Sequence, residues 1–270
     1  MARTVRWLLY AVVGLYGAVC LLAFAFQRRL LYFPDRYPEQ AALAAAGRLG
    51  LAPWRDARGA LAGWRAAPAG RPAARLLVLH GNAGSALDRL HYAAAFSRLG
   101  VEVILLEYPG YGARQGSPSR DSLGAAAADA LDRMAAEGEE PVWVLGESLG
   151  SGVAARAVAL RPGAIRGLVL ITPFARMADV VRLHYPLLPS ALLLDRYAPE
   201  ADLAGWSGPT ALLLAGRDEV VGVAQGRRLF EGLRGPKRLQ VQEEATHNGL
   251  DLDPAAPFWS EMAAFLAGGR

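Results

Sequence analysis

Short apolar runs alternate with longer amphipathic stretches from about residue 75 to the C-terminal end of the chain. The runs have the length and composition of buried strands, and they comprise residues 76–79, 101–108, 141–145, 168–171, 210–215 and 239–241. The stretches between and after them predict helices at residues 86–99, 123–136, 149–159, 224–233 and 257–267. Near-continuous apolar strands separated by helices are typical of a mostly parallel sheet covered on both faces, so the predicted fold class is α/β.

The chain before and within this alternation follows other patterns. Residues 31–53 are polar and rich in alanine and predict a connecting segment, whereas residues 54–65 around Gly59 predict a hairpin. We therefore expect one catalytic domain over residues 54–270. Residues 177–208 are apolar but have no evident strand partner. Such an insertion in an α/β enzyme is often a lid over the site, although an extra packed helix fits the pattern equally well.

Residues 1–30 predict a membrane anchor. The twenty residues from Trp7 to Phe26 carry no charge, and as a helix they are long enough to cross roughly 30 Å of hydrocarbon. Trp7 at one end and Arg28 and Arg29 at the other suit the two membrane interfaces. A cleaved signal peptide fits this segment less well, because its apolar core is shorter and is followed by an Ala-x-Ala site, and none directly follows Phe26 here. A buried core helix also fits less well, because such a helix rarely lies between arginines at a chain terminus.

The net charge of +4 belongs to this N-terminal segment. Residues 1–29 contain four arginines and no acid, which leaves 25 basic and 25 acidic residues over positions 30–270. Nucleic-acid binding needs a concentrated basic face, so we exclude it. The only cysteine, Cys20, excludes an internal disulfide framework and a cysteine-rich metal site. Arginine in place of lysine, with abundant Ala and Gly, indicates a bacterial source. We expect the inner membrane with the catalytic domain outside the cytoplasm, because a single N-terminal span usually acts as a signal anchor.

The motif Gly146-Glu147-Ser148-Leu149-Gly150 follows one predicted strand directly and opens the next helix. A serine nucleophile must stand on a sharp strand-to-helix turn, and small residues two positions away on each side permit that turn. The pattern alone is weak, but this context makes Ser148 the candidate nucleophile.

A serine hydroxyl needs a base to take its proton and an acid to orient that base. Among the four histidines, His247 follows the last predicted strand and is the candidate base; a surface turn histidine is the plain alternative. Asp218 follows the preceding strand and is the candidate acid, with helix capping as its alternative role and Glu219 as the nearest substitute. The order Ser148, Asp218, His247 is that of α/β-hydrolases.

The first strand of the alternation runs into His80-Gly81-Asn82, where the oxyanion of an acyl-transfer reaction needs backbone donors. We assign this role to the N–H groups of Asn82 and Leu149. His80 is more consistent with a structural hydrogen-bonding residue than with a second base.

Together these segments resemble the α/β-hydrolase superfamily, and within it the membrane-anchored serine hydrolases related to the fungal bud-emergence protein and to animal depalmitoylating hydrolases. The resemblance rests on residues 80–84, 107–112, 146–150, 216–218 and 246–248. It implies Ser148, Asp218 and His247 as nucleophile, acid and base. Two loops depart from the relatives: residues 107–110 read Glu-Tyr-Pro-Gly in place of Asp-x-Arg-Gly, and Val221-Gly222 replaces Val-Pro.

Our main hypothesis is a membrane-anchored serine hydrolase that cleaves an ester or thioester of a small-molecule or lipid-like acyl substrate through an acyl-enzyme. No metal or organic cofactor is implied. A serine peptidase uses the same residues but must break a more stable amide. A tethered, inactive binding module is the alternative of another class, and it predicts loss of a triad residue, which the sequence does not show.

Overall fold

An eight-stranded sheet forms the centre of the protein, which we describe from a computed structural model over residues 2–268. The strand order is β10-β9-β8-β7-β4-β6-β3-β2. The first six strands of this order are parallel to one another. Strand β3 is antiparallel to both of its neighbours, β6 and β2. The strands are β2 (Ala52–Arg55), β3 (Leu61–Ala66), β4 (Ala74–Leu79), β6 (Val101–Leu106), β7 (Val142–Glu147), β8 (Gly167–Ile171), β9 (Thr210–Ala215) and β10 (Lys237–Gln242). The predicted α/β class, the six apolar runs and the hairpin are confirmed.

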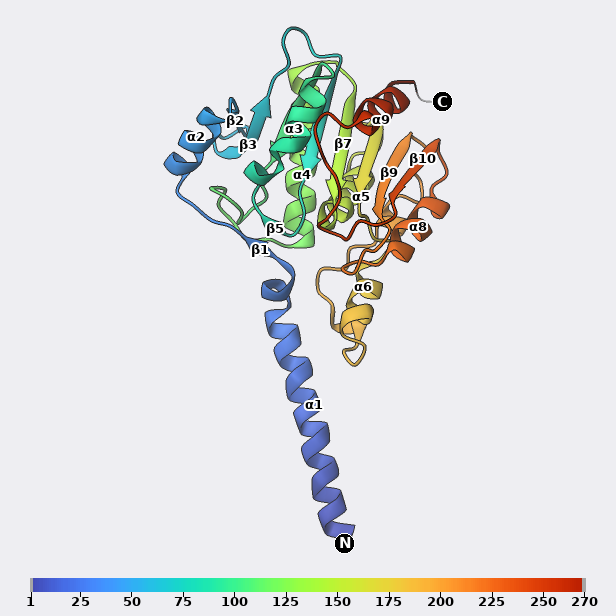
Figure 1. Ribbon diagram of the computed structural model, residues 1–270. Coiled ribbons are helices and arrows are strands. Elements are labelled where there is room, and N and C mark those ends of the chain that lie inside the picture. Colours follow the sequence, from blue (N-terminus) through green and yellow to red (C-terminus); the bar gives the residue numbers. More distant parts are fainter. Residues whose placement is uncertain (1, 269–270) are drawn as a thin grey trace.

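Helices cover both faces of this sheet, as the apolar strands require (Figure 1). One face packs against α4 (Arg120–Glu137), α5 (Leu149–Leu160) and α8 (Val223–Gly232). The other packs against α2 (Glu39–Arg48), α3 (Leu90–Ser97) and α9 (Pro257–Gly268). Successive residues of a strand enter alternate cores: Leu77 and Leu79 of β4 belong to the first core, and Leu76 and Val78 to the second.

Helix α1 (Ala2–Leu31) projects away from the α/β body (Figure 1). Its mean hydropathy reaches 2.3, and no side chain along it is buried. By length and composition it is a candidate transmembrane helix.

The segment between α1 and the hairpin contains more structure than its polar composition predicts. Strand β1 (Phe33–Pro34) pairs in parallel with β5 (Ala83–Gly84), and α2 buries Ala42 and Ala46. The first residues of β2 also belong to it. Residues 31–53 therefore pack on the domain.

The insertion at residues 177–208 follows β8 and precedes β9. It contains α6 (Met177–His184), a 3₁₀ turn η2 (Ser190–Leu192) and the short α7 (Pro199–Asp202). In Figure 1, α6 and the loop after it lie on the same side of the body as α1. The helix predicted at residues 86–99 begins as a 3₁₀ turn, η1 (Ala86–Arg89), which leads into α3.

Candidate active site

Ser148 occupies the turn between β7 and α5. Its φ of +50° and ψ of −114° lie outside the ordinary regions for a residue with a side chain. The Ser148 N–H donates to the Ile171 carbonyl at 2.8 Å, which ties the turn to the neighbouring strand β8. A strained strand-to-helix turn of this kind presents a serine hydroxyl at the end of the sheet.

The glycines on each side of Ser148 permit the turn. A Cβ atom on Gly150 would overlap the Leu79 carbonyl oxygen at the end of β4, and one on Gly146 would lie 2.5 Å from the Gly150 carbonyl oxygen. The first turn of α5 therefore approaches the sheet at a distance that only glycine allows.

Three side chains form a hydrogen-bonded chain at this end of the sheet. His247 Nε2 lies 2.9 Å from Ser148 Oγ, and His247 Nδ1 lies 2.8 Å from Asp218 Oδ2. Asp218 follows β9 and His247 follows β10, so the carboxyl ends of three parallel strands supply the group. The side chains of His247 and Asp218 are 7% and 2% exposed. In this arrangement the serine hydroxyl donates to the ring, and the ring N–H donates to the carboxylate.

The loop after β9 keeps Asp218 ionised. Its Oδ1 accepts the N–H groups of Val220, Val221 and Gly222 at 3.0, 2.9 and 3.3 Å. Burial alone would raise the pKa of Asp218, but the hydrogen bond and charge of His247 and the bonds from Val221 and Val220 lower it below its ordinary value. Gly222 adopts φ +81°, which a proline cannot adopt, and it supplies a donor that proline lacks. A proline at this position would therefore need a different conformation of the loop.

Glu219 and Asp218 contact different parts of His247. Its carboxylate accepts the backbone N–H of His247 at 3.1 Å and so fixes the loop that carries the ring. The adjacent acid therefore positions the backbone of His247, while Asp218 holds its side chain.

Asn82 lies in the loop between β4 and β5. The preceding residue, Gly81, lies beside the strand-to-helix turn, since a Cβ atom on it would be 3.8 Å from Ser148 Cβ. The Asn82 side chain donates to the Leu31 carbonyl at 2.9 Å, at the end of α1. The Asn82 carbonyl accepts the Phe33 N–H at 2.9 Å and the Tyr111 hydroxyl at 2.7 Å. Within the described chain the Asn82 N–H has no acceptor. Leu149 is the first residue of α5, where amide groups have no intrahelical acceptor.

His80 is a buried structural residue. Its Nδ1–H donates to the Gly81 carbonyl at 2.8 Å, and its ring packs on Tyr108 with a centroid separation of 4.0 Å. Burial and the charge of Arg89 lower the pKa of His80 to about 3, so the ring is neutral at pH 7. His80 Nε2 lies 3.8 Å from the buried Glu107, whose pKa burial raises to about 7.

Two contacts near the site were not foreseen from the sequence. Glu147, inside the serine motif, accepts Arg89 Nε at 2.7 Å and the Tyr92 hydroxyl at 3.0 Å. His184 of α6 donates from Nε2 to the Val220 carbonyl at 2.6 Å, which ties the insertion to the Asp218 loop. One sequence signal pointed to the Glu147 contacts, namely a charged residue inside a motif of otherwise uncharged residues. No sequence signal pointed to the contact of His184 with Val220.

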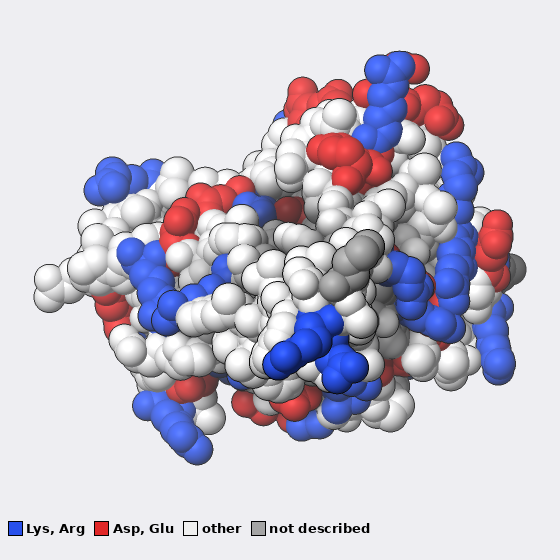
Figure 2. Space-filling model, turned by 90° about the horizontal axis from the view of Figure 1, so that it is seen from below, with Lys and Arg blue, Asp and Glu red and all other residues white. Residues whose placement is uncertain are grey.

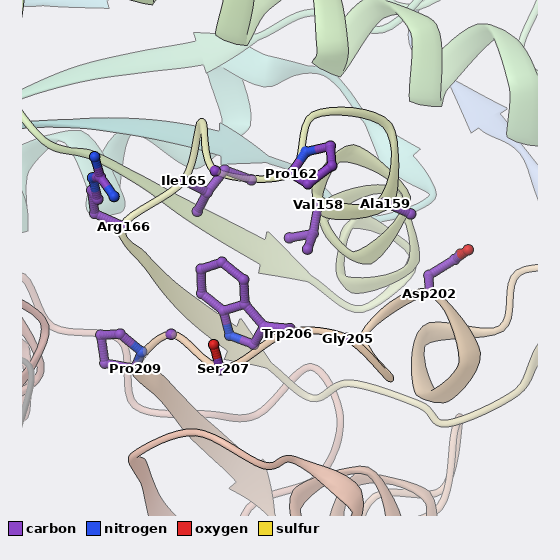
Figure 3. A pocket seen from close by; sticks show the side chains of 12 residues that line it. Val158, Ala159, Pro162, Ile165, Arg166, Asp202, Gly205, Trp206, Ser207 and Pro209 are labelled. Atoms are coloured by element: carbon purple, nitrogen blue, oxygen red, sulfur yellow. The ribbon is translucent and has the colours of Figure 1, made fainter.

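A pocket of about 230 Å³ adjoins the triad and is lined by His247, Asn248, Arg89, Glu147 and Thr172 among others. A larger hollow of about 530 Å³ lies between the end of α5 and the loop before β9, around Trp206 (Figure 3). His247 of the triad lines the smaller pocket and no triad residue lines the larger hollow, so the smaller pocket is the candidate site. Over residues 2–268 no three His, Cys, Asp or Glu side chains are grouped so that they could hold a metal ion.

Comparison with known proteins agrees with this geometry. A family profile described as serine aminopeptidase, S33, matches residues 70–205. The chain belongs to this family of α/β-hydrolases. It is 34% identical to the Mycobacterium tuberculosis protein Rv2307c, with 90% of this chain and 88% of that protein covered. It is 31% identical to protein bem46 of Schizosaccharomyces pombe, with 74% and 69% covered, and 29% identical to the lysophosphatidylserine lipase ABHD12 of Macaca fascicularis, with 73% and 55% covered.

Solved structures share the fold of this α/β-hydrolase. An esterase of Pyrococcus furiosus matches with a TM-score of 0.66 and 17% identity, with 88% of this chain and 97% of that chain covered. A monoacylglycerol lipase of Paleococcus ferrophilus matches with a TM-score of 0.59 and 20% identity, with 77% and 99% covered. The predicted superfamily, its resemblance to the bud-emergence branch and its identity as a hydrolase are confirmed.

Proposed function

We propose that this α/β-hydrolase is a membrane-anchored serine hydrolase that cleaves carboxylic ester or thioester bonds through an acyl-enzyme on Ser148. The observation that carries the proposal is the continuous hydrogen-bonded chain from Ser148 Oγ through His247 to Asp218, set on a strained turn. The relatives named as lipases support a substrate with a lipid-like acyl group.

Each residue has a defined role in the proposed reaction. His247 Nε2 takes the hydroxyl proton as Ser148 Oγ bonds to the acyl carbon, and the ionised Asp218 stabilises the imidazolium that forms. The carbonyl oxygen becomes an oxyanion that accepts the N–H groups of Asn82 and Leu149. His247 then gives its proton to the leaving alcohol or thiol. Water, deprotonated by the same histidine, attacks the acyl-enzyme and releases the carboxylic acid and free Ser148.

A serine peptidase is the second candidate, because the matching family is described as an aminopeptidase. An aminopeptidase must bind the free α-amino group of its substrate, for which a carboxylate is the suitable partner. Glu147, the acid adjacent to the nucleophile, is already paired with Arg89 and Tyr92. This pairing favours the ester hydrolase. An inactive binding module is disfavoured by the hydrogen-bonded triad.

The anchor and the lid belong to the same proposal. Helix α1 would cross a bacterial inner membrane once, with residues 54–270 on the extracytoplasmic side, and residues 177–208 would act as the lid. Fusions of alkaline phosphatase and of a fluorescent protein to the C-terminus test the orientation: active phosphatase and a dark fluorescent protein are expected. The reverse pattern contradicts the orientation.

A fluorophosphonate probe tests the chemistry directly, because it reacts with an activated serine. The full-length protein should be labelled and should hydrolyse p-nitrophenyl esters faster than the matching peptide substrates. Ser148→Ala should abolish both activities while thermal unfolding stays unchanged. A folded parent protein that the probe leaves unlabelled refutes the proposal, and faster cleavage of peptides than of esters replaces it with the peptidase.

A further inference from the structure

The tip of the insertion exposes apolar side chains. Residues 183–194, here called the lid tip, are twelve consecutive residues without Asp, Glu, Lys or Arg. Leu187 is 80% exposed, and Leu183, Tyr185 and Leu194 are 58%, 51% and 49% exposed. A group of large apolar side chains on a surface marks an interaction site, because each one costs free energy in water.

The lid tip lies along α1. The Tyr16 hydroxyl donates to the Leu187 carbonyl at 2.7 Å, and Gln27 Nε2 donates to the Leu192 carbonyl at 3.1 Å. The Leu194 N–H donates to Gln27 Oε1 at 2.7 Å. Tyr16 and Gln27 are eleven positions apart, or about 16 Å along a helix. The tip therefore extends from the polar end of α1 to the middle of its uncharged stretch, and Figure 1 shows the two side by side.

Part of the backbone of the lid tip is hydrogen-bonded, whereas the N–H groups of Leu187, Ser190 and Ala191 have no acceptor among the described residues. In hydrocarbon every backbone N–H and carbonyl must find a partner within the protein. Two prolines in the tip have no N–H, and the N–H groups of Leu188, Leu192 and Leu193 donate to carbonyls within the tip. Tyr16 and Gln27 supply partners for three further groups, as described above.

Charged residues mark the ends of this segment. Arg182 precedes it and Asp195 and Arg196 follow it. Asp195 pairs with Arg28 near the polar end of α1, with 2.9 Å between Nε and Oδ2, so the charged base of the tip meets the charged end of the helix. Viewed from below, with α1 pointing toward the reader, much of the face is uncharged, and basic side chains lie both in its middle and around it, with acidic side chains among them (Figure 2).

We propose that the lid tip inserts into the lipid leaflet beside α1, so that the occupant of this apolar surface is the acyl region of the bilayer. This inference rests on the proposed anchoring by α1. The base of the tip continues into α6, whose His184 donates to the Val220 carbonyl in the Asp218 loop. The inserted segment thus connects the leaflet with the loop that carries Asp218.

Depth-dependent quenching tests the insertion in the full-length protein. Cys20→Ser removes the only native thiol, and Leu187→Cys then carries an environment-sensitive fluorophore. Val13→Cys, inside α1, is the control for an inserted site. Leu99→Cys, an exposed leucine just before β6 at the opposite end of the sheet, is the control for a site in water. The labelled proteins are reconstituted in phosphatidylcholine vesicles.

The Leu187 probe should resemble the Val13 probe: strong quenching by spin-labelled lipid, a blue-shifted emission and several-fold less quenching by iodide than at Leu99. A Leu187 probe that iodide quenches as strongly as the Leu99 probe, while Val13 is protected, overturns the inference but leaves the anchor intact. A Leu187 probe shielded from both quenchers means that the tip packs on protein, which also overturns it. An unprotected Val13 overturns the anchor and the inference together, whereas fluorophosphonate labelling reports separately on the chemistry.

Discussion

Glu107 offers a sharp test of how burial controls charge next to the site. Its carboxylate is fully buried, accepts the Ala86 N–H at 3.0 Å and lies 3.5 Å from Trp64 Nε1. Burial raises its pKa from 4.5 to about 7, although the two hydrogen bonds act in the opposite direction. The informative variant is Glu107→Gln, which keeps the shape of the side chain and cannot ionise.

The sign and size of the effect follow from linkage. Between pH 4.5 and about 7 the unfolded chain has lost the Glu107 proton while the folded protein still holds it. The stability that Glu107 contributes is therefore complete below pH 4.5 and lost as the pH rises through about 7. The loss amounts to roughly 3 kcal/mol, at about 1.4 kcal/mol for each pH unit between the two values. For a domain of this size that corresponds to roughly 6–12 °C in Tm.

Thermal unfolding of the full-length protein in detergent micelles, followed by circular dichroism from pH 4.5 to 8, measures this effect. The Tm of the parent minus that of Glu107→Gln should fall as the pH rises, because groups common to both proteins cancel in the difference. A difference that stays flat across this range refutes a raised pKa at Glu107. A difference that increases with pH means that the buried carboxylate is stabilised as an anion.

The remaining predictions concern the triad and its supports, and all use kinetics with p-nitrophenyl esters and thermal unfolding. Asp218→Asn should lower kcat/KM by about 10⁴-fold, since the ring then takes the wrong tautomer; a loss under tenfold excludes Asp218 as the orienting acid. Gly222→Pro removes an N–H donor and cannot reach φ +81°, whereas Gly222→Ala keeps the donor at a strain cost of about 1–2 kcal/mol. The proline variant should therefore lose more stability and activity than the alanine variant. Equal losses in the two variants contradict this. Tyr111→Phe frees the Asn82 carbonyl and should lower kcat several-fold at constant KM, and an effect on KM alone counts against a positioning role.

Local patterns were sufficient for the parallel sheet and for the strand-to-helix turn at Ser148. The buried strands are near-continuous apolar runs, interrupted by Arg75 in β4 and Glu102 in β6, and the glycines at 146 and 150 are needed within the motif itself. The positions of Asp218 and His247 followed from a general property of such sheets, namely that the carboxyl ends of parallel strands meet at one edge. The structure brings both residues to Ser148.

Features that depend on distant contacts were not predictable in the same way. Helix α2 is rich in alanine and buries only Ala42 and Ala46, so its amphipathic signal is weak. Strands β1 and β5 have two residues each and form only because the end of α1 meets the loop after β4. The partners of Tyr16 and Gln27 lie more than 160 residues away, and no sequence period links them.

The hydrogen bond from the Asn82 side chain to the Leu31 carbonyl connects the end of α1 directly to the loop after β4. Leu31 is the last residue of the helix, where carbonyl groups lack an intrahelical donor, and Asn82 is the proposed oxyanion residue. Under the proposed anchoring, a thinner or thicker bilayer would tilt α1 and so displace the amide that we propose as an oxyanion donor. Rates in vesicles of different acyl length should therefore differ at equal substrate density. The thickness of the bilayer would then be a mechanical variable of the proposed reaction.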